Sequence, residues 1–543
     1  MRIRTRKNLP KKNIAITILF LLPIIGFASY AAFLFYILND MASFTLYLDP
    51  PDTDTFCDLD EIDMDILEQM ANHYDRQMEK WHMPTNISLG VTFTDFDYDE
   101  VERYESTDNG NLHIGYTLTA NCLRYATALK ENDDALKVNA TRMVKKCLTA
   151  LSLFMAAPNG GLGINPDTGK WYPGTLARFV AAPDEKLIHP WMFGEHYKHF
   201  NGTGDYKNYR VRLYTSRDEL GGFYIGTAAV LKFITDDDED SEWCVDRVRL
   251  IVTQMIEGFR NTNWLLLGGN GNPTGSDLNP VLEGSTWQLT LLRIGAAAYP
   301  DKYLSLYHYC ASKILTAGSA KMGSVSNAIG GYYAFSFGLC VELALIWLEE
   351  DPALRYHYIK NFEESFYSIV RYHRNNFHNL GHLIFMTMLT KEQRTQFENP
   401  DYSEKDIKWD VIDNMWRFYT SGWAEGIRNY NLTQRPHSTR ETSLNPEMRE
   451  KLRQPYLKKW RDFFENNLFG PLFSWIEFEF DFKEEDEQYL LPLTVSEYGI
   501  HHWMWEHNKF DDEGGEPYGN GLTQAAPNSY ICIYWMMRYY DII

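Results

Sequence analysis

Positive charge is scarce in this 543-residue chain, which has 52 Lys and Arg against 73 Asp and Glu and a formal net charge of −21. An acidic protein repels extended polyanions, so we do not expect nucleic acid as a partner. Common metal and nucleotide motifs are also missing. The sequence has no Cys-x-x-Cys pair, no His-Glu-x-x-His helix and no Gly-x-x-x-x-Gly-Lys phosphate loop. We therefore predict neither a cofactor nor a bound metal.

Cysteine is sparse, and its spacing matches no zinc or haem pattern. The seven residues are Cys57, Cys122, Cys147, Cys244, Cys310, Cys340 and Cys532. Most lie within apolar helical patterns, where a buried free thiol is the expected state. Cys122 and Cys147 fall on two successive predicted helices, and a disulfide between them is the alternative. Sequence does not decide between the two because it gives no Cα separation.

One long segment has no charged side chain at all. Residues 14–38 form an unbroken apolar run that is long enough, at helical rise, to cross a bilayer. Basic residues precede the run and acids do not: Arg2, Arg4, Arg6, Lys7, Lys11 and Lys12. This asymmetry predicts a cytoplasmic flank at 1–13 and a transmembrane anchor at 14–38. A cleaved signal peptide is the alternative, but its apolar core is normally about 7–15 residues long.

The anchor predicts a single-pass membrane protein whose remaining chain lies outside the cell or in a lumen. Residues 39–57 read as a tether, stiffened by two prolines, Pro50 and Pro51. Residues 58–543 form the exterior domain.

Strand signals are few, with one clean alternation at 476–482, and no fixed repeat period occurs. Apolar residues instead recur at helical spacing. The expected class is therefore all-α, with about eleven helices arriving largely in pairs. After a helix-like stretch at 58–81, the helices lie near 118–129, 144–154, 217–234, 245–259, 284–298, 301–316, 332–349, 352–373, 379–390, 407–420 and 448–467.

Aromatic residues are abundant, at 35 Tyr, 31 Phe and 15 Trp, and they suit both a large helical core and a cleft that stacks sugar rings. Several connections are long and rich in Gly, Pro, Trp and Asn. Long ordered loops in a compact domain are usually functional. The loops are 157–186, 261–283, 421–447 and 483–528.

Paired helices, uneven loops and abundant aromatics together resemble the six-hairpin glycosidase-like (α/α)6 toroids, over about residues 58–543. Four local strings are similar to strings of such toroids: Gly-Tyr-Thr at 115–117, Pro-Gly-Thr-Leu-Ala-Arg at 173–178, Thr-Ser-Arg-Asp-Glu at 215–219 and the closing segment 534–540. The resemblance implies six inner helices wrapped by six outer ones, with the active site at one mouth of the ring. It also points to carbohydrate chemistry.

The segment 215–222 is the best candidate for a site. Ser216 and Glu219 have the spacing of a capping box at a helix start. Gly221 and Gly222 follow one turn later, where each costs about 1 kcal/mol relative to Ala unless something must approach the backbone closely. A neighbouring helix or a sugar would both fit.

Glycoside cleavage needs two carboxyl groups, one of them an acid with a raised pKa. Asp218 is the first choice, with Glu219 beside it. The second carboxyl is expected from Glu283 or Glu425, which lie at loop–helix junctions beside Gly and Trp. The residues expected to bind substrate are Tyr116, Arg178, Arg217, Trp287, His378 and Trp423.

Some candidates have two interpretations. His378 and His382 would share a helix face, either as metal ligands or, as we prefer, as core or loop-lining residues. The acidic run 236–240 suggests a metal motif, but its place between two helices favours a solvated turn.

The resulting hypothesis is a membrane-anchored exterior carbohydrate-active enzyme, a glycoside hydrolase using paired carboxylates on a glycan or other small-molecule substrate. The alternatives are a lyase or epimerase on acidic sugars, using His378, Tyr116, Arg178 and Arg217, a non-catalytic glycan-binding toroid, and an isoprenoid-type enzyme.

Overall fold

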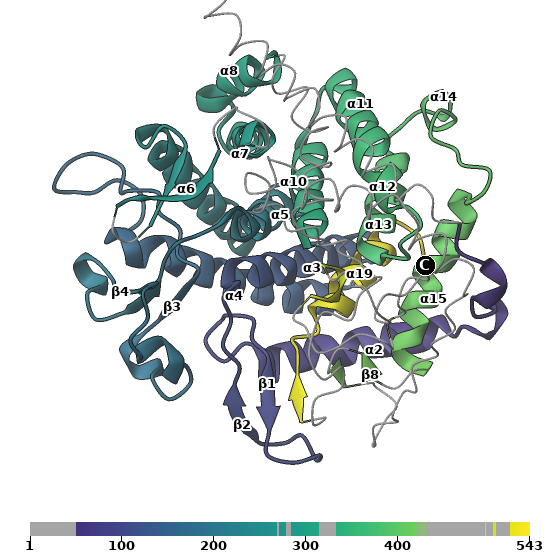
Figure 1. Cartoon of the computed structure of the whole chain (residues 1–543), viewed down its shortest axis with the longest axis horizontal. Helices are drawn as coiled ribbons and strands as arrows, with labels where there is room; N and C mark the ends of the chain where they lie inside the picture. The colour runs from purple at the N-terminus through teal and green to yellow at the C-terminus, as the bar shows by residue number, and fades with distance from the viewer. Residues whose placement is uncertain are drawn as a thin grey trace, which may run out of the picture. The chain divides into compact units, whose positions relative to one another are not determined.

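The computed structural model describes most of the chain from residue 50 on, and nearly all of that part is helix or loop (Figure 1). The described ranges are 50–268, 271–278, 284–313, 333–420, 423–424, 427–428, 495, 503–506 and 522–543. The predicted predominance of helix is confirmed. The finer architecture, a ring of six helix pairs, stays a prediction. The predicted helix 448–467 and strand 476–482 lie outside the described ranges.

Residues 14–38, the predicted anchor, also lie outside the described part of the chain. Where the structure is described, none of the helices combines the length and apolarity that crossing a bilayer requires. Residues 49–543 form one compact unit.

The helices alternate with connections of very different length. They are α2 (Met64–Gln77), α3 (Gly110–Glu131), α4 (Asp134–Asn159), α5 (Arg217–Phe233), α6 (Glu239–Asn261), α7 (Gly284–Ala298), α8 (Pro300–Ala311), α10 (Tyr333–Leu348), α11 (Pro352–Asn361), α12 (Ser368–Val370), α13 (Asn376–Thr387), α14 (Lys391–Arg394), α15 (Glu404–Thr420) and α19 (Asn528–Tyr539). The stretches predicted at 217–234, 284–298 and 332–349 agree with α5, α7 and α10 to within a residue at each end. The stretch predicted at 352–373 is interrupted by a π-helical turn, η8 (Phe362–Tyr367).

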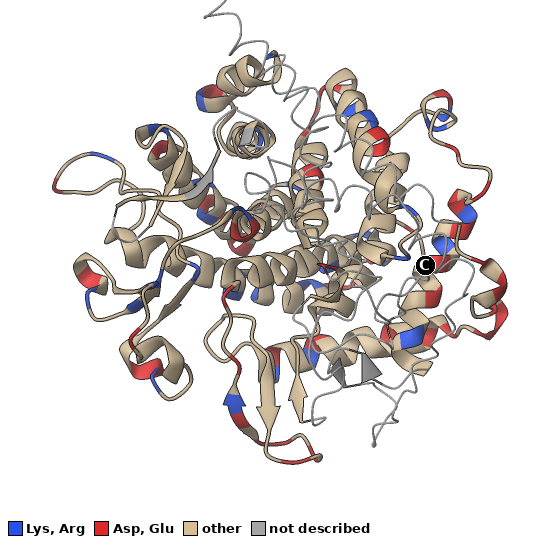
Figure 2. Cartoon of the chain, viewed as in Figure 1, with Lys and Arg blue, Asp and Glu red and all other residues tan. Residues whose placement is uncertain are grey.

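The helices contact one another in a regular succession. α3 contacts α5, α5 contacts α7, α7 contacts α10, α10 contacts α13, α13 contacts α19, and α19 contacts α3. Each of these six helices also contacts a partner from a second set, namely α4, α6, α8, α11, α15 and α2 in the same order. Figure 2 shows that α3 carries few charged residues, as expected for a helix buried along most of its length.

Short antiparallel strands lie in the connections. β1 (Val91–Phe93) pairs with β2 (Val101–Tyr104) and with β10 (Thr523–Gln524), so this sheet joins the start of the domain to its end. β5 (Arg210–Arg212) lies between β3 (Phe179–Ala181) and β4 (His199–Asn201). Two further pairs are β6 (Leu265–Leu267) with β7 (Pro273–Asp277), and β8 (Trp423–Ala424) with β9 (Ile427–Arg428).

The backbones of helices α3 and α5 are in direct contact at positions where both helices have glycine. A Cβ atom added to Gly222 would lie 2.3 Å from the Cα atom of Leu112, and one added to Gly115 would lie 2.1 Å from the carbonyl oxygen of Gly222. A Cβ atom at Gly221 would lie 3.0 Å from the Cβ atom of Phe337 on α10. Of the two explanations for this glycine pair, a neighbouring helix is the one that applies to Gly222.

Replacing Gly222 by alanine is expected to lower the free energy of unfolding by about 3 kcal/mol, because the added methyl group overlaps backbone atoms that cannot rotate away. Denaturant unfolding of both proteins measures the difference. Gly194→Ala is the matched control, since the nearest atom to its added Cβ is 3.7 Å away. Its effect should stay within about 0.5 kcal/mol. Equal stability of the Gly222 variant and the wild type would contradict the contact.

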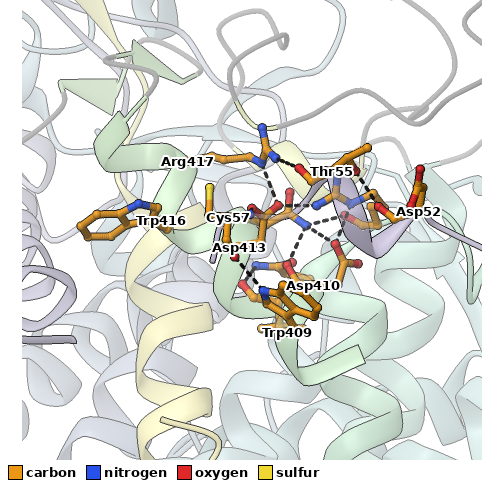
Figure 3. Close-up of polar contacts among 12 residues, drawn as sticks. Asp52, Thr55, Cys57, Trp409, Asp410, Asp413, Trp416 and Arg417 are labelled. Carbon is orange, nitrogen blue, oxygen red and sulfur yellow. Dashed lines mark hydrogen bonds and ion pairs between the residues drawn. The ribbon is translucent and has the colours of Figure 1, made fainter. Parts of the chain in front are cut away.

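The segment that leads into the domain is hydrogen-bonded to α15 (Figure 3). The backbone N–H of Cys57 donates to Asp413 at 2.8 Å, and Trp409 Nε1 donates to the carbonyl of Cys57 at 2.8 Å. Arg417 donates to the carbonyl of Thr55 at 3.0 Å. The last residues of the predicted tether are therefore bound to the domain.

Beneath that segment lies a buried ion network. Arg374 donates to Asp410 at 2.6 Å and also pairs with Asp413, and both carboxyl groups are fully buried. Arg417 supplies a second cation to Asp413 at 2.7 Å. Burial alone would raise the pKa of Asp413, but Arg374 and Arg417 outweigh it and hold that pKa below its ordinary value.

All seven cysteines are free thiols. Cys122 and Cys147 are buried on α3 and α4 and do not pair, so the disulfide alternative is not found. Burial raises the pKa of Cys147 to about 12. Such thiols are unreactive core residues.

Candidate functional site

Asp218 lies in the first turn of α5, with one fifth of its side chain exposed. The predicted capping box is wrong, because the Ser216 side chain makes no cap hydrogen bond. Ser216 Oγ instead accepts from Arg178 at 2.9 Å, and Glu219 accepts from the backbone N–H of Asn111 at 2.9 Å. Asn111 lies in the first turn of α3, where N–H groups have no partner within their own helix. Glu219 therefore caps a neighbouring helix.

Arg178, just before β3, lies close to three acidic side chains of the site. Its guanidinium lies 3.6 Å from Asp218, 3.8 Å from Glu219 and 3.3 Å from Asp108. Asp108 also pairs with Lys198 at 3.1 Å and with Arg212 at 2.5 Å. Partial burial opposes ionisation of Asp108, but these cations lower its pKa. The β3-β5-β4 sheet thus fixes a set of cations beside the start of α5.

Glu219 has no exposed surface. Burial raises its pKa well above the ordinary value, and Arg178 opposes that shift. A carboxyl group without solvent access cannot touch a substrate in this conformation. Glu219 therefore positions α3 and Arg178, and the expectation that it is a catalytic group is not supported.

A second carboxyl group, Glu506, comes from a short helical turn, η10 (Met504–Glu506). The carbonyl of Trp505 accepts from Ser336 on α10 at 2.8 Å and from Asn375, the N-cap of α13, at 2.7 Å. Trp505 Nε1 donates to the carbonyl of Ser529 on α19 at 2.9 Å. Three helices therefore fix the backbone that carries Glu506.

Asp218 acts electrostatically on Glu506. Burial raises the pKa of Glu506 to about 8, and the Asp218 carboxylate adds to that shift. Part of the Glu506 surface still reaches solvent. The ring of Trp503, just before this turn, stacks on that of Tyr116 with centroids 3.8 Å apart. The Asp218 carboxylate is therefore near enough to Glu506 to act on its ionisation.

Aromatic rings continue from this site along α10 and α7. Phe337 lies against Gly221, one turn after Asp218. Its ring contacts Trp287 at 6.0 Å and Tyr333 at 5.7 Å between centroids. Tyr333 is exposed, Phe337 is half-buried, and Trp287 is nearly buried. A row of aromatic rings therefore runs from the exposed Tyr333 to Phe337, beside the first turns of α5.

The other predicted site residues are placed differently. Tyr116 and His378 are fully buried, so neither can contact a ligand in this conformation. Arg217 is half-buried in the first turn of α5. Glu283 and Glu425 lie outside the described residues, and the structure describes only the backbone of Trp423, in β8.

Two further interpretations can be checked. His378 and His382 are both buried on α13, and His382 lines a cavity, in agreement with the preferred core or loop-lining role. Within the described ranges, no group of three or more His, Cys, Asp or Glu residues could hold a metal ion. Only the first three residues of the acidic run 236–240 lie between α5 and α6, since α6 begins at Glu239; Asp238 caps α6 and pairs with Lys137 at 2.9 Å.

Sequence reasoning missed Glu506. The available signal was its place in the string Trp-Met-Trp-Glu at 503–506, since a carboxyl group beside two tryptophans is a candidate for a raised pKa.

Comparison with family models, with curated proteins and with solved structures found no match in any of the three. The function is therefore inferred from the site itself.

Proposed function

We propose that this protein is a membrane-anchored exterior carbohydrate-active enzyme that hydrolyses glycosidic bonds with Asp218 and Glu506. The observation that carries the proposal is the carboxyl pair, in which one member has a raised pKa and the other is paired with Arg178. Glycosidases use such a pair, because one carboxyl group must donate a proton while the other acts as a base or nucleophile. Glu506 takes the place proposed from sequence for Glu283 or Glu425.

The roles follow from the surroundings of each group. Glu506, with a pKa of about 8, is protonated at neutral pH and donates its proton to the leaving sugar oxygen. Asp218, beside the Arg178 guanidinium, is the carboxylate that activates water or attacks the sugar carbon. The rings of Phe337 and Tyr333 offer apolar faces on which a sugar can stack.

The fold we propose is the six-hairpin glycosidase-like (α/α)6 toroid. Its support is the succession of contacts from α3 through α5, α7, α10, α13 and α19 back to α3, with one outer partner for each helix. Asp218 at the start of α5 and Glu506 beside the starts of α10 and α13 then lie at one mouth of that ring. Elimination by Tyr116 or His378 gains no support, because both side chains are buried.

Asp218→Asn is expected to lower turnover by about 10²–10⁴-fold, since it removes a positioned base but keeps the side-chain shape. The full chain, purified in detergent, would be screened for cleavage and binding on a glycan panel. Asp246→Asn, on the exposed face of α6, is the control and should keep wild-type turnover. Equal turnover in the Asp218 variant would remove this residue from the mechanism. Glycan binding without cleavage by the wild type would indicate a binding module.

Membrane anchoring rests on the uncharged run 14–38 and the basic residues before it. Protease added to sealed cells or vesicles should digest the domain and leave an N-terminal tag protected. Full protection of residues 58–543 would contradict this topology. Release of a domain that starts within the tether would instead indicate a cleaved signal peptide.

A further inference from the structure

A second cavity lies well away from the Asp218 region in sequence. It is an open cavity of about 1190 Å³ among η8, α12, α13, α14 and the start of α15. Its apolar lining includes Met386, Leu389 and Ile407, and the buried ring of Tyr402 adds to it. A cavity of this size accommodates a small organic molecule.

A fixed histidine lines this cavity. His382 Nδ1 lies 2.8 Å from Glu363 Oε1, and the ring of Tyr367 stacks on the imidazole with centroids 4.3 Å apart. Tyr367 is itself held by a hydrogen bond to Asn379 at 3.1 Å. Because Glu363 occupies Nδ1, Nε2 is the atom left for a ligand.

The backbone around Glu363 supports a site. Glu363 and Tyr367 both belong to the π-helical turn η8, which interrupts an otherwise regular helix. Such turns add a residue to the helical repeat and occur frequently at functional sites. Here both the Glu363 carboxylate and the Tyr367 ring of this turn contact the imidazole of His382.

The cavity lining has an excess of unpaired positive charge. Four cations line it, and in the described part of the chain none of them forms an ion pair with an acid: Arg371, Lys391, Arg394 and Lys405. Arg371 is half-buried, and its Nε atom has no hydrogen-bond partner among the described residues. Of the four acids that line the cavity, Glu363 and Glu364 are engaged with His382 and Lys360. Glu398 and Glu404 are exposed, as are Lys391 and Lys405, so Arg371 and Arg394 are the partly buried cations of the lining.

We propose that this cavity binds an amphipathic organic anion, in which Arg371 pairs with a carboxylate, His382 Nε2 hydrogen-bonds to it, and Met386, Leu389 and Ile407 contact its apolar part. The planar guanidinium of Arg371 carries N–H donors in a geometry that matches a carboxylate. The apolar lining beneath excludes a fully hydrated inorganic ion as the best ligand. This site is independent of the proposed glycosidase function.

Octanoate is the probe, titrated calorimetrically into the full chain. We expect a dissociation constant of about 1 mM or tighter for the wild type. Arg371→Met should weaken binding at least tenfold, because it removes a charge-assisted hydrogen bond and keeps the aliphatic stem. Lys170→Met makes the same charge change at an exposed position outside the cavity and should leave the affinity unchanged. No octanoate binding, or equal affinity in the Arg371 variant, would overturn the proposal.

Two comparisons separate the parts of the ligand. Octanol lacks the anion and inorganic phosphate lacks the apolar part, so both should bind at least tenfold more weakly than octanoate. Equal binding of either would overturn the ligand class. If Arg371→Met fails to fold, Arg371→Lys replaces it in the affinity measurement. Lysine keeps the charge but lacks the planar fork, so octanoate should still bind more weakly than to the wild type, and equal affinity would overturn the proposal. The imidazole resonances of His382, identified by their loss in His382→Gln, should shift on addition of octanoate, and unshifted resonances would also contradict the site.

Discussion

Replacing Arg374 by methionine is expected to lower the free energy of unfolding by about 3–5 kcal/mol. The variant leaves the fully buried carboxylates of Asp410 and Asp413 without their shared cation. Asp410 keeps hydrogen bonds from Tyr402 at 2.8 Å and from Asn379 at 3.0 Å, and these do not replace a full charge. Chemical denaturation monitored by circular dichroism would measure the loss.

Arg103→Met is the control for this experiment. Arg103 is 58% exposed and pairs with Glu105 on the surface, so its loss should cost less than about 1 kcal/mol. The contribution of Arg374 should also vanish in acid. Because the folded pKa of Asp413 lies below its ordinary value, this stabilisation is present near neutral pH and is lost as the pH falls through that lowered pKa. A difference between wild type and variant that does not shrink as the pH falls through the acid range would contradict the role of the Asp413 carboxylate.

Glu506→Gln is expected to lower kcat/KM on the glycan substrate by about 10²–10⁴-fold, because glutamine keeps the shape but donates no acidic proton. The pH profile gives a second readout. With a pKa of about 8, Glu506 must keep its proton to act as the acid, so wild-type activity should fall as the pH rises through about 8. Any activity that remains in the variant should lack this basic limb.

Glu350→Gln provides the matched control, since that carboxyl group is 94% exposed and lies at the far end of α10. Its activity and pH profile should equal those of the wild type. A basic limb at the same pH in Glu506→Gln would assign it to another group. Unchanged kcat/KM in Glu506→Gln would instead favour Glu283 or Glu425 as the second carboxyl group.

Much of the helical framework could be predicted from the sequence. The bounds of α5, α7 and α10 follow from apolar spacing, because each buries a continuous face against several neighbours. The strands β3, β4 and β5 could not be predicted, since three residues are too few to show alternation. The π-helical turn at 362–367 could not be predicted either, because its sequence does not differ in pattern from that of a regular helix.

Only part of the candidate site could be predicted from the sequence. Asp218 stood out because Gly221 and Gly222 follow it in a helix, a pattern that needs a close neighbour. The capping box failed because Ser216 and Glu219 find stronger partners in Arg178 and in the first turn of α3, which are remote in sequence. Glu506 was missed for the same reason, since its raised pKa depends on burial and on Asp218, far along the chain.

The hydrogen bonds of residues 55–57 to α15 also have a mechanical consequence. Any tension that enters the domain from the chain before residue 52 meets these bonds first, at Cys57 and Thr55. Arg374 and Asp410 lie beneath these bonds and connect them to Tyr402 and α13 through further hydrogen bonds. A pull on the chain before residue 52 would thus act on the contacts of residues 55–57 with α15 before it reached the buried ion network.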